Sequence, residues 1–201
     1  MKIKTEQIHF SEGLSLESGE RLDSFDLIIE SYGELNESKS NAILLCHAFS
    51  GNHHAAGEDE ELGIGWWDQI VGPEKAIDTE KYYVVCCNNL GGCAGSSGPT
   101  TINAATNKVF GKDFPLVTVD DWVNSQKMLM DKLDIPYWHL VAGGSLGGML
   151  ALQWSIAYPD KIKKAGIFAA AAKSSTVSYT HLRAHETKAN RVCRRLLVKK
   201  K

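Results

Sequence analysis

The stretch VAGGSLGGMLALQWSIAYPD, residues 141–160, joins an apolar strand to an apolar helix through a turn of glycines with one serine at its apex. Gly143, Ser145 and Gly147 fit the pattern G-x-S-x-G. In this pattern the small flanking residues let the backbone turn sharply and lift the serine oxygen above the sheet. The N-terminus of the following helix favours negative charge that develops near the serine. The turn therefore indicates Ser145 as a candidate nucleophile.

Two other interpretations of this turn compete with the nucleophile. A dinucleotide-binding turn has the pattern G-x-G-x-x-G, and it needs a glycine where Ser145 stands, so that pattern is broken. The second alternative is a glycine-rich connection with an incidental serine, which the turn alone leaves open.

The chain around the turn alternates strands with helices. Apolar runs predict strands at 25–33, 41–48, 81–89, 137–143 and 163–172. A first helix is predicted to begin at Thr118, which Asp121 can help to cap, and a second to run from Leu146 to Tyr158. This order predicts an α/β fold with a largely parallel sheet. The glycine-rich segments 49–65 and 89–115 follow strand ends, where such sheets place their binding sites.

Several further segments resemble one family closely. They read CHAFSGNHHAAG, GWWDQIVGPEKAIDTEKYYVVCCNNLGGCAGSSGPTTINAAT, FPLVTVDDWVNSQKMLMDKLDI and GGSLGGMLALQW. Together they resemble the homoserine O-acetyltransferases of the α/β-hydrolase superfamily, over roughly residues 25–175. The turn at Ser145 alone indicates only the superfamily, whereas GWWD, GPEKAIDT and GGCAGSSGPT are far more specific.

The resemblance implies a covalent acyl transfer in methionine biosynthesis. Ser145 would attack the thioester of acetyl-CoA, and the hydroxyl of L-homoserine would then accept the acetyl group. The backbone N–H groups of Phe49 and Leu146 would form the oxyanion hole. Acetyl-CoA is a co-substrate here, so no cofactor or metal is implied. The N-terminal segment MKIKTEQIHF has no apolar run of the kind that a secretory signal contains, so we expect a cytoplasmic protein. For a full-length family member, the resemblance further implies a homodimer.

The acid and the histidine of the catalytic triad have no counterpart in this chain, since in α/β-hydrolases both follow the serine. His47, His53, His54 and His139 all precede Ser145. Asp160 follows it, in a position expected to be on the surface. The first three histidines match no common metal-ligand spacing. We therefore expect an incomplete, inactive domain over residues 1–175, truncated after the strand that follows the turn.

Residues 176–201 differ from the rest of the chain. They carry 8 basic residues and one acidic residue, against 14 basic and 23 acidic residues in 1–175. VSYTHLRAHET looks like the translation of a sequencing adapter, so we interpret 176–201, with His181 and His185, as a foreign and disordered read-through product.

Composition excludes several other classes of protein. The acidic residues of 1–175 argue against a nucleic-acid-binding surface. No stretch reaches the roughly 18 apolar residues that a membrane span requires. Five cysteines show no Cys-x-x-Cys spacing, so we expect reduced thiols and no zinc site.

Two functions other than acyl transfer to homoserine remain open. A serine ester hydrolase on the same scaffold would share Ser145 and would admit water to the acyl-enzyme. A non-catalytic α/β binding module would explain the missing triad residues.

Overall fold

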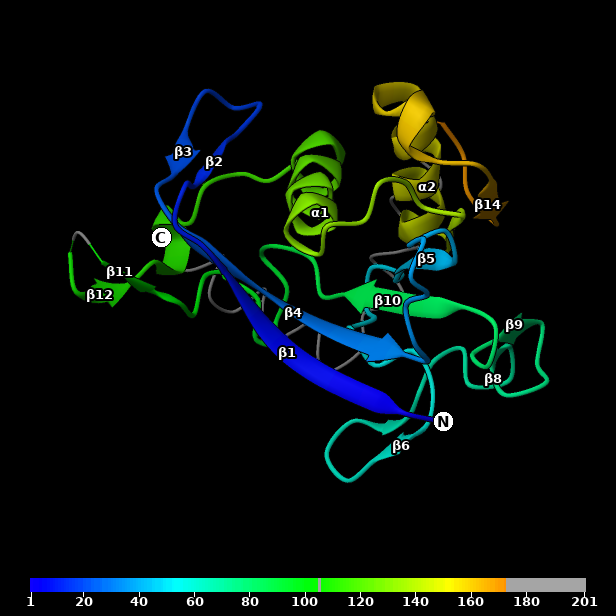
Figure 1. The fold of residues 1–201 in the computed structure, drawn as a ribbon. Coiled ribbons are helices and arrows are strands. Elements are labelled where there is room, and N and C mark those ends of the chain that lie inside the picture. The colour runs from blue at the N-terminus through cyan, green and yellow to red at the C-terminus, as the bar shows by residue number, and fades with distance from the viewer. Residues whose placement is uncertain (105, 173–201) are drawn as a thin grey trace.

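The computed structural model describes residues 1–104 and 106–172, which build a six-stranded sheet in the order β1–β4–β10–β5–β13–β14 (Figure 1). Its strands are β1 (Ile3–Phe10), β4 (Phe25–Tyr32), β10 (Tyr83–Cys87), β5 (Ala42–Cys46), β13 (Leu140–Gly144) and β14 (Ala165–Phe168). The pairs β10–β5, β5–β13 and β13–β14 are parallel, and β1–β4 and β4–β10 are antiparallel. The prediction of a mostly parallel sheet is thus confirmed.

Two helices, α1 (Val119–Lys132) and α2 (Leu146–Ala157), cover one face of this sheet (Figure 1). The predicted start of α1 is confirmed, because the Thr118 and Asp121 side chains cap it reciprocally. The backbone N–H of Thr118 donates to Asp121 Oδ2 over 2.8 Å. The other oxygen of Asp121 accepts from the N–H of Glu17 over 2.9 Å, which ties the helix start to the N-terminal part of the chain. Short 3-10 helices η1 (Gly111–Asp113) and η2 (Pro159–Lys161) complete the helical elements of the described residues.

The loops contain four small two-stranded sheets. They pair β2 (Leu14–Ser15) with β3 (Arg21–Leu22), β6 (Glu58–Asp59) with β7 (Gly63–Ile64), β8 (Val71–Gly72) with β9 (Ile77–Asp78), and β11 (Ile102–Asn103) with β12 (Lys108–Val109). In Figure 1, β6, β8 and β9 lie on the side of the sheet opposite to the helices.

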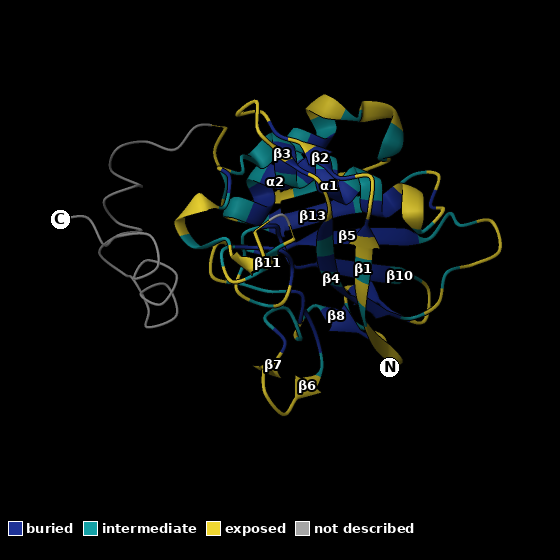
Figure 2. Ribbon diagram, turned by 90° about the vertical axis from the view of Figure 1, so that its left-hand side faces the viewer, coloured by how far each residue is buried: buried dark blue, intermediate teal, exposed yellow. Residues whose placement is uncertain are grey.

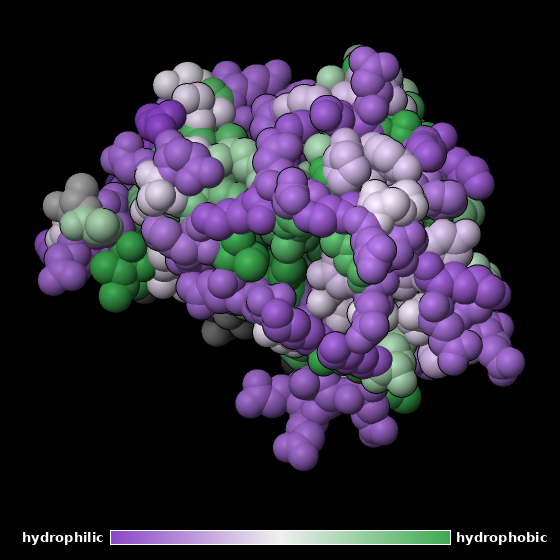
Figure 3. All heavy atoms as spheres, viewed as in Figure 1, coloured by the Kyte–Doolittle hydropathy of each residue, from purple (hydrophilic) through white to green (hydrophobic). Residues whose placement is uncertain are grey.

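The central strands β5 and β10 are buried on both faces. Successive side chains of each strand point to opposite sides of the sheet. Leu44 and Val85 belong to the core beneath the two helices. Their neighbours Leu45 and Val84 belong to a second core, which Ala55, Val71 and other residues of the loops close. Figure 2 shows the central strands buried and the outer loops exposed. The face seen in Figure 3 is covered mostly by hydrophilic residues, as expected when the apolar side chains lie between layers.

The structure corrects some expectations about the elements. Strand β1 was not predicted, because its side chains are largely exposed and alternate too weakly to stand out. The strand predicted at 137–143 begins only at Leu140, and the one predicted at 163–172 spans Ala165–Phe168. Cys46, Cys86 and Cys87 are free and buried, as expected. Cys93 is disulfide-bonded, so the prediction of reduced thiols is wrong there; this residue lies in an exposed loop, outside the core strands.

The expectation that 176–201 is a foreign tail lies outside the described residues. Within the part of the chain that is described, no helix combines the length and the apolar character needed to cross a bilayer.

Candidate active site

Ser145 lies at the junction of β13 and α2 in a strained backbone conformation. Its φ of 56° and ψ of −118° are unusual for a residue other than glycine. Its N–H donates to the carbonyl of Phe168 over 3.0 Å, and its carbonyl accepts from the N–H of Met149 over 3.1 Å. The residue therefore ends the strand and starts the helix at the same time. Ser145 is exposed while most of its neighbours are buried, which is the geometry expected of a nucleophile elbow.

The two outer glycines of the G-x-S-x-G pattern are required by packing. A Cβ atom on Gly147 would lie 1.9 Å from the carbonyl oxygen of Cys46, at the end of β5. A Cβ atom on Gly143 would lie 2.4 Å from the backbone of Gly147. The middle glycine, Gly144, is different, because a Cβ atom there would lie 3.9 Å from its nearest neighbour, the carbonyl oxygen of Phe168. The pattern thus reflects the close approach of α2 to the end of β5.

The two expected oxyanion donors lie on either side of this contact. Phe49 follows the end of β5 by three residues, and Leu146 is the first residue of α2. Within residues 1–104 and 106–172, the backbone N–H groups of Phe49 and Leu146 donate no hydrogen bond. Unpaired N–H groups beside a helix N-terminus suit the binding of a developing oxyanion. The roles of Ser145, Phe49 and Leu146 stay predictions that this arrangement supports.

His47 fixes the start of the loop that carries Phe49. Its Nε2 lies 3.1 Å from the backbone N–H of Asn89, so Nε2 accepts, and its Nδ1 donates to the Ala48 carbonyl over 2.7 Å. Burial lowers the pKa of His47, which favours this neutral form. Because both ring nitrogens are occupied, His47 cannot serve Ser145 as a base.

Within the described residues, no hydrogen bond joins the Ser145 side chain to His53, His54 or His139. His54 is 3% exposed and is held by Glu30 and by the Gly63 carbonyl. His53 is buried, and its Nδ1 has no hydrogen-bond partner among the described residues. His139 precedes β13, at the opposite end of that strand from Ser145, and its ring lies 5.2 Å from the ring of Tyr82.

The described residues after Ser145, 146–172, contain no histidine. Asp160 is exposed on η2, as expected. His181 and His185 lie outside the described residues. No group of three or more His, Cys, Asp or Glu side chains in the described part of the chain could hold a metal ion.

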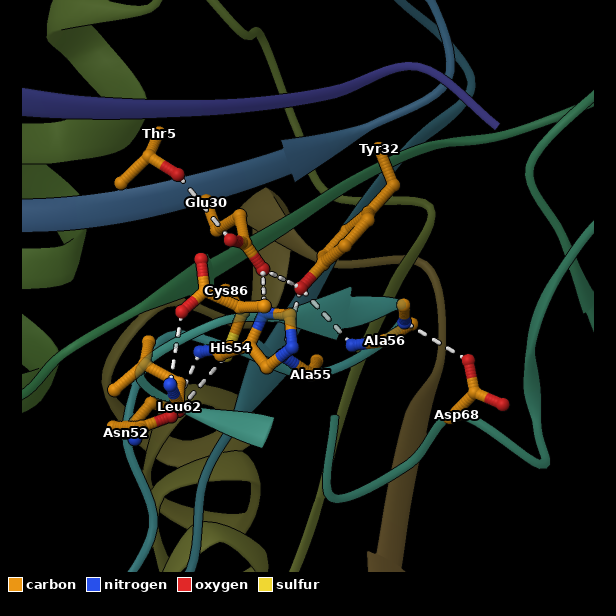
Figure 4. A network of polar contacts seen from close by, with 12 residues as sticks. Thr5, Glu30, Tyr32, Asn52, His54, Ala55, Ala56, Leu62, Asp68 and Cys86 are labelled. Carbon is orange, nitrogen blue, oxygen red and sulfur yellow. Dashed lines mark hydrogen bonds and ion pairs between the residues drawn. The ribbon is translucent and has the colours of Figure 1, made fainter. Parts of the chain in front are cut away.

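Sequence reasoning missed two polar residues of β4. Glu30 and Tyr32 are buried, at 3% and 0% exposure, and both contact the loop after β5 (Figure 4). The signal was present, because the run FDLIIESY places a glutamate inside an otherwise buried strand. A buried carboxylate needs a partner, and that partner lies 24 residues away in the sequence.

Comparisons with known proteins agree with this geometry. The family model described as alpha/beta hydrolase fold matches residues 41–186. The homoserine O-succinyltransferase of Pseudomonas aeruginosa is 56% identical over 175 residues, covering 86% of this chain and 46% of that protein. The chain spans less than half the length of the curated relatives it matches.

Two solved structures are similar as well. Esterase E22 has a TM-score of 0.81 at 36% identity, over 91% of this chain and 52% of that one. The homoserine O-acetyltransferase from Bacillus anthracis has a TM-score of 0.82 at 30% identity, over 98% of this chain and 60% of that one. With the elbow, the mostly parallel sheet and a family model that matches most of its length, the chain belongs to the alpha/beta hydrolase fold family.

Proposed function

We propose that this chain carries the nucleophile and the oxyanion hole of a homoserine O-acyltransferase. The observation that supports it most is the 56% identity to a homoserine O-succinyltransferase, over an alignment of 175 residues. The strained Ser145, and the N–H groups of Phe49 and Leu146 that have no partner within residues 1–104 and 106–172, supply the parts that such a reaction needs.

The proposed reaction has two steps. Ser145 Oγ loses its proton as it attacks the carbonyl carbon of the acyl-CoA thioester, the C–S bond breaks, and the CoA thiolate takes up that proton and leaves as the thiol. The hydroxyl of L-homoserine then attacks the acyl-serine, its proton is removed, and the Ser145 hydroxyl is restored. In both steps the negative charge on the carbonyl oxygen is stabilised by the Phe49 and Leu146 N–H groups and by the N-terminus of α2.

The acyl donor is a separate part of the proposal. The relatives that are 54% to 56% identical are named succinyltransferases, whereas the acetyltransferase from Bacillus anthracis is 30% identical. This difference favours succinyl-CoA over the acetyl-CoA that the sequence resemblance implied.

The test uses the full-length product of the gene. The enzyme is given L-homoserine with either succinyl-CoA or acetyl-CoA, and thiol release and the O-acylhomoserine product are measured. We expect thiol release that depends on L-homoserine, with a higher kcat/KM for succinyl-CoA. Absence of homoserine-dependent thiol release with both donors would refute the proposed function.

An ester hydrolase is the second candidate, because esterase E22 is similar at 36% identity. A hydrolase would pass the acyl group to water. It would therefore cleave p-nitrophenyl acetate with turnover, and L-homoserine would neither accelerate the reaction nor appear in the product. A non-catalytic binding module would show no reaction of Ser145 with either substrate.

A further inference from the structure

We propose that Tyr32, Glu30 and His54 form a positioning network that holds the loop of residues 47–57 so that the Phe49 N–H faces the oxyanion. The network contacts no reacting atom itself. The inference rests on the proposed function to the extent that Phe49 is an oxyanion donor for acylation of Ser145.

The loop is attached at both ends and also at Asn52, whose carbonyl accepts from the Trp66 indole N–H over 3.0 Å, and Phe49 lies between these attachments. At its start, His47 is bound to Asn89 and to the Ala48 carbonyl. At its end, the backbone N–H groups of Ala55 and Ala56 both donate to the hydroxyl of Tyr32, over 2.7 and 3.1 Å. Between these points the chain makes one tight turn, closed by the Gly51 N–H on the Ala48 carbonyl over 2.9 Å. The position of Phe49 therefore depends on the attachments that lie on either side of it in the loop.

The attachment at the end of the loop is a closed hydrogen-bond network (Figure 4). The Tyr32 hydroxyl accepts from two N–H groups, so its own hydrogen is directed to Glu30 Oε2. The same Glu30 oxygen lies 2.8 Å from His54 Nδ1, and Thr5 donates to Glu30 Oε1 over 3.2 Å. His54 Nε2 donates to the Gly63 carbonyl over 3.0 Å.

Apolar packing could stabilise this region without fixing the loop. Glu30, Tyr32 and His54 are all at most 3% exposed, and Tyr32 belongs to the second core, which also contains Cys86 and Ala55. Replacing a buried polar cluster by apolar side chains is often neutral for stability. An apolar side chain, however, cannot accept the N–H groups of Ala55 and Ala56. The directional bonds of the network thus specify one loop conformation.

The test compares Tyr32→Phe with Tyr158→Phe in the full-length gene product. Both variants remove one tyrosine hydroxyl that forms a hydrogen bond. The Tyr158 hydroxyl donates to Asn124 over 2.7 Å, at the end of α2 and away from the loop. We expect Tyr32→Phe to lower kcat by about 10- to 100-fold with little change of KM, because misplacing a reacting group by about 1 Å costs about 100-fold. Tyr158→Phe is expected to keep the wild-type kcat.

A second pair of variants covers the case in which Tyr32→Phe does not fold. His54→Asn can still donate an N–H to Glu30, whereas His54→Ala cannot. We expect His54→Asn to recover a large part of the kcat lost in His54→Ala. A purely structural role would lower the melting temperature of these variants and leave the kcat of the folded enzyme unchanged, and that result would overturn the inference.

The acylation rate with p-nitrophenyl acetate separates this inference from the proposed function. For each variant, the rate of p-nitrophenol release is measured, and the rate of the Ser145→Ala enzyme is subtracted from it. If the wild-type enzyme acylates Ser145 with this ester but does not acylate L-homoserine, the proposed function fails and the slower acylation of Tyr32→Phe still supports the network. If p-nitrophenol release does not depend on Ser145, the inference fails as well.

Discussion

Replacing Gly147 by alanine is expected to damage the candidate active site through packing. The added Cβ would lie 1.9 Å from the Cys46 carbonyl oxygen, 2.7 Å from the Cys46 carbonyl carbon and 3.0 Å from the His47 carbonyl oxygen. All three are backbone atoms, so no flexible side chain can move aside. Because an ordinary contact begins at 3.4 Å, α2 and the end of β5 must separate by about 1.5 Å.

This separation acts directly on the proposed oxyanion hole, because Ser145 and Leu146 move with α2 and Phe49 moves with the end of β5. A displacement of about 1 Å between reacting groups can cost 100-fold in rate. Overpacking typically costs about 1–3 kcal/mol of stability. We therefore expect Gly147→Ala to lose at least about 100-fold in kcat and several degrees in melting temperature.

Gly144→Ala is the matched control for stability. Its Cβ would meet nothing nearer than the Phe168 carbonyl oxygen at 3.9 Å, so the melting temperature is expected to stay close to wild type. The measurements are thermal melting and steady-state thiol release from acyl-CoA with L-homoserine, on the full-length gene product. A Gly147→Ala enzyme with wild-type kcat and melting temperature would refute the packing argument.

Four other predictions follow from the same site. Ser145→Ala is expected to leave the fold intact and to lower kcat by about 10⁶-fold, by analogy with serine-protease nucleophiles; turnover near wild type would contradict it. An acyl-serine intermediate requires ping-pong kinetics, with CoA released before homoserine binds, and initial-rate plots that intersect would argue against this order. Burial lowers the pKa of His47 below 6.5, so the unfolded state binds a proton more readily than the folded state as the pH falls. The contribution of neutral His47 to the free energy of unfolding is therefore present above pH 6.5 and decreases as the pH falls below it. We expect the free energy of unfolding, measured with urea between pH 7.5 and 5.5, to fall less steeply in His47→Asn than in the wild type. The two slopes should differ by at most about 1.4 kcal/mol per pH unit. The 201-residue chain alone is expected to release no CoA, because residues 146–175 contain no histidine to activate Ser145; homoserine-dependent release would contradict this.

The features that sequence reasoning predicted well are local ones. The cap of α1 involves Thr118 and Asp121, three residues apart, and the elbow lies within five consecutive residues. In both cases the residue type dictates the backbone, since a hydroxyl and a carboxylate can cap a helix and glycines allow a sharp turn. The residue pattern that predicts each feature lies within one short segment, so spacing was sufficient, although each feature also contacts a distant residue, Glu17 for the cap and Cys46 for the elbow.

The features that sequence reasoning missed depend on contacts between segments that are distant in the sequence. The bond between His47 and Asn89 spans 42 residues, and that between Glu30 and His54 spans 24. Strand β1 owes its place to pairing with β4, since its own side chains are mostly exposed. Such contacts follow from the order of the strands in the sheet, and the composition of the chain does not reveal that order.

The end of β5 connects the two halves of the candidate site. The Cys46 carbonyl sets how closely α2 and Ser145 can approach, and the next residue, His47, begins the loop that carries Phe49. Tyr32 then fixes the end of that loop from β4. One close backbone contact and these hydrogen bonds, on neighbouring strands, therefore contribute to the position of Ser145 relative to Phe49. Because all of them act on the same separation, their contributions to catalysis should not be independent of one another.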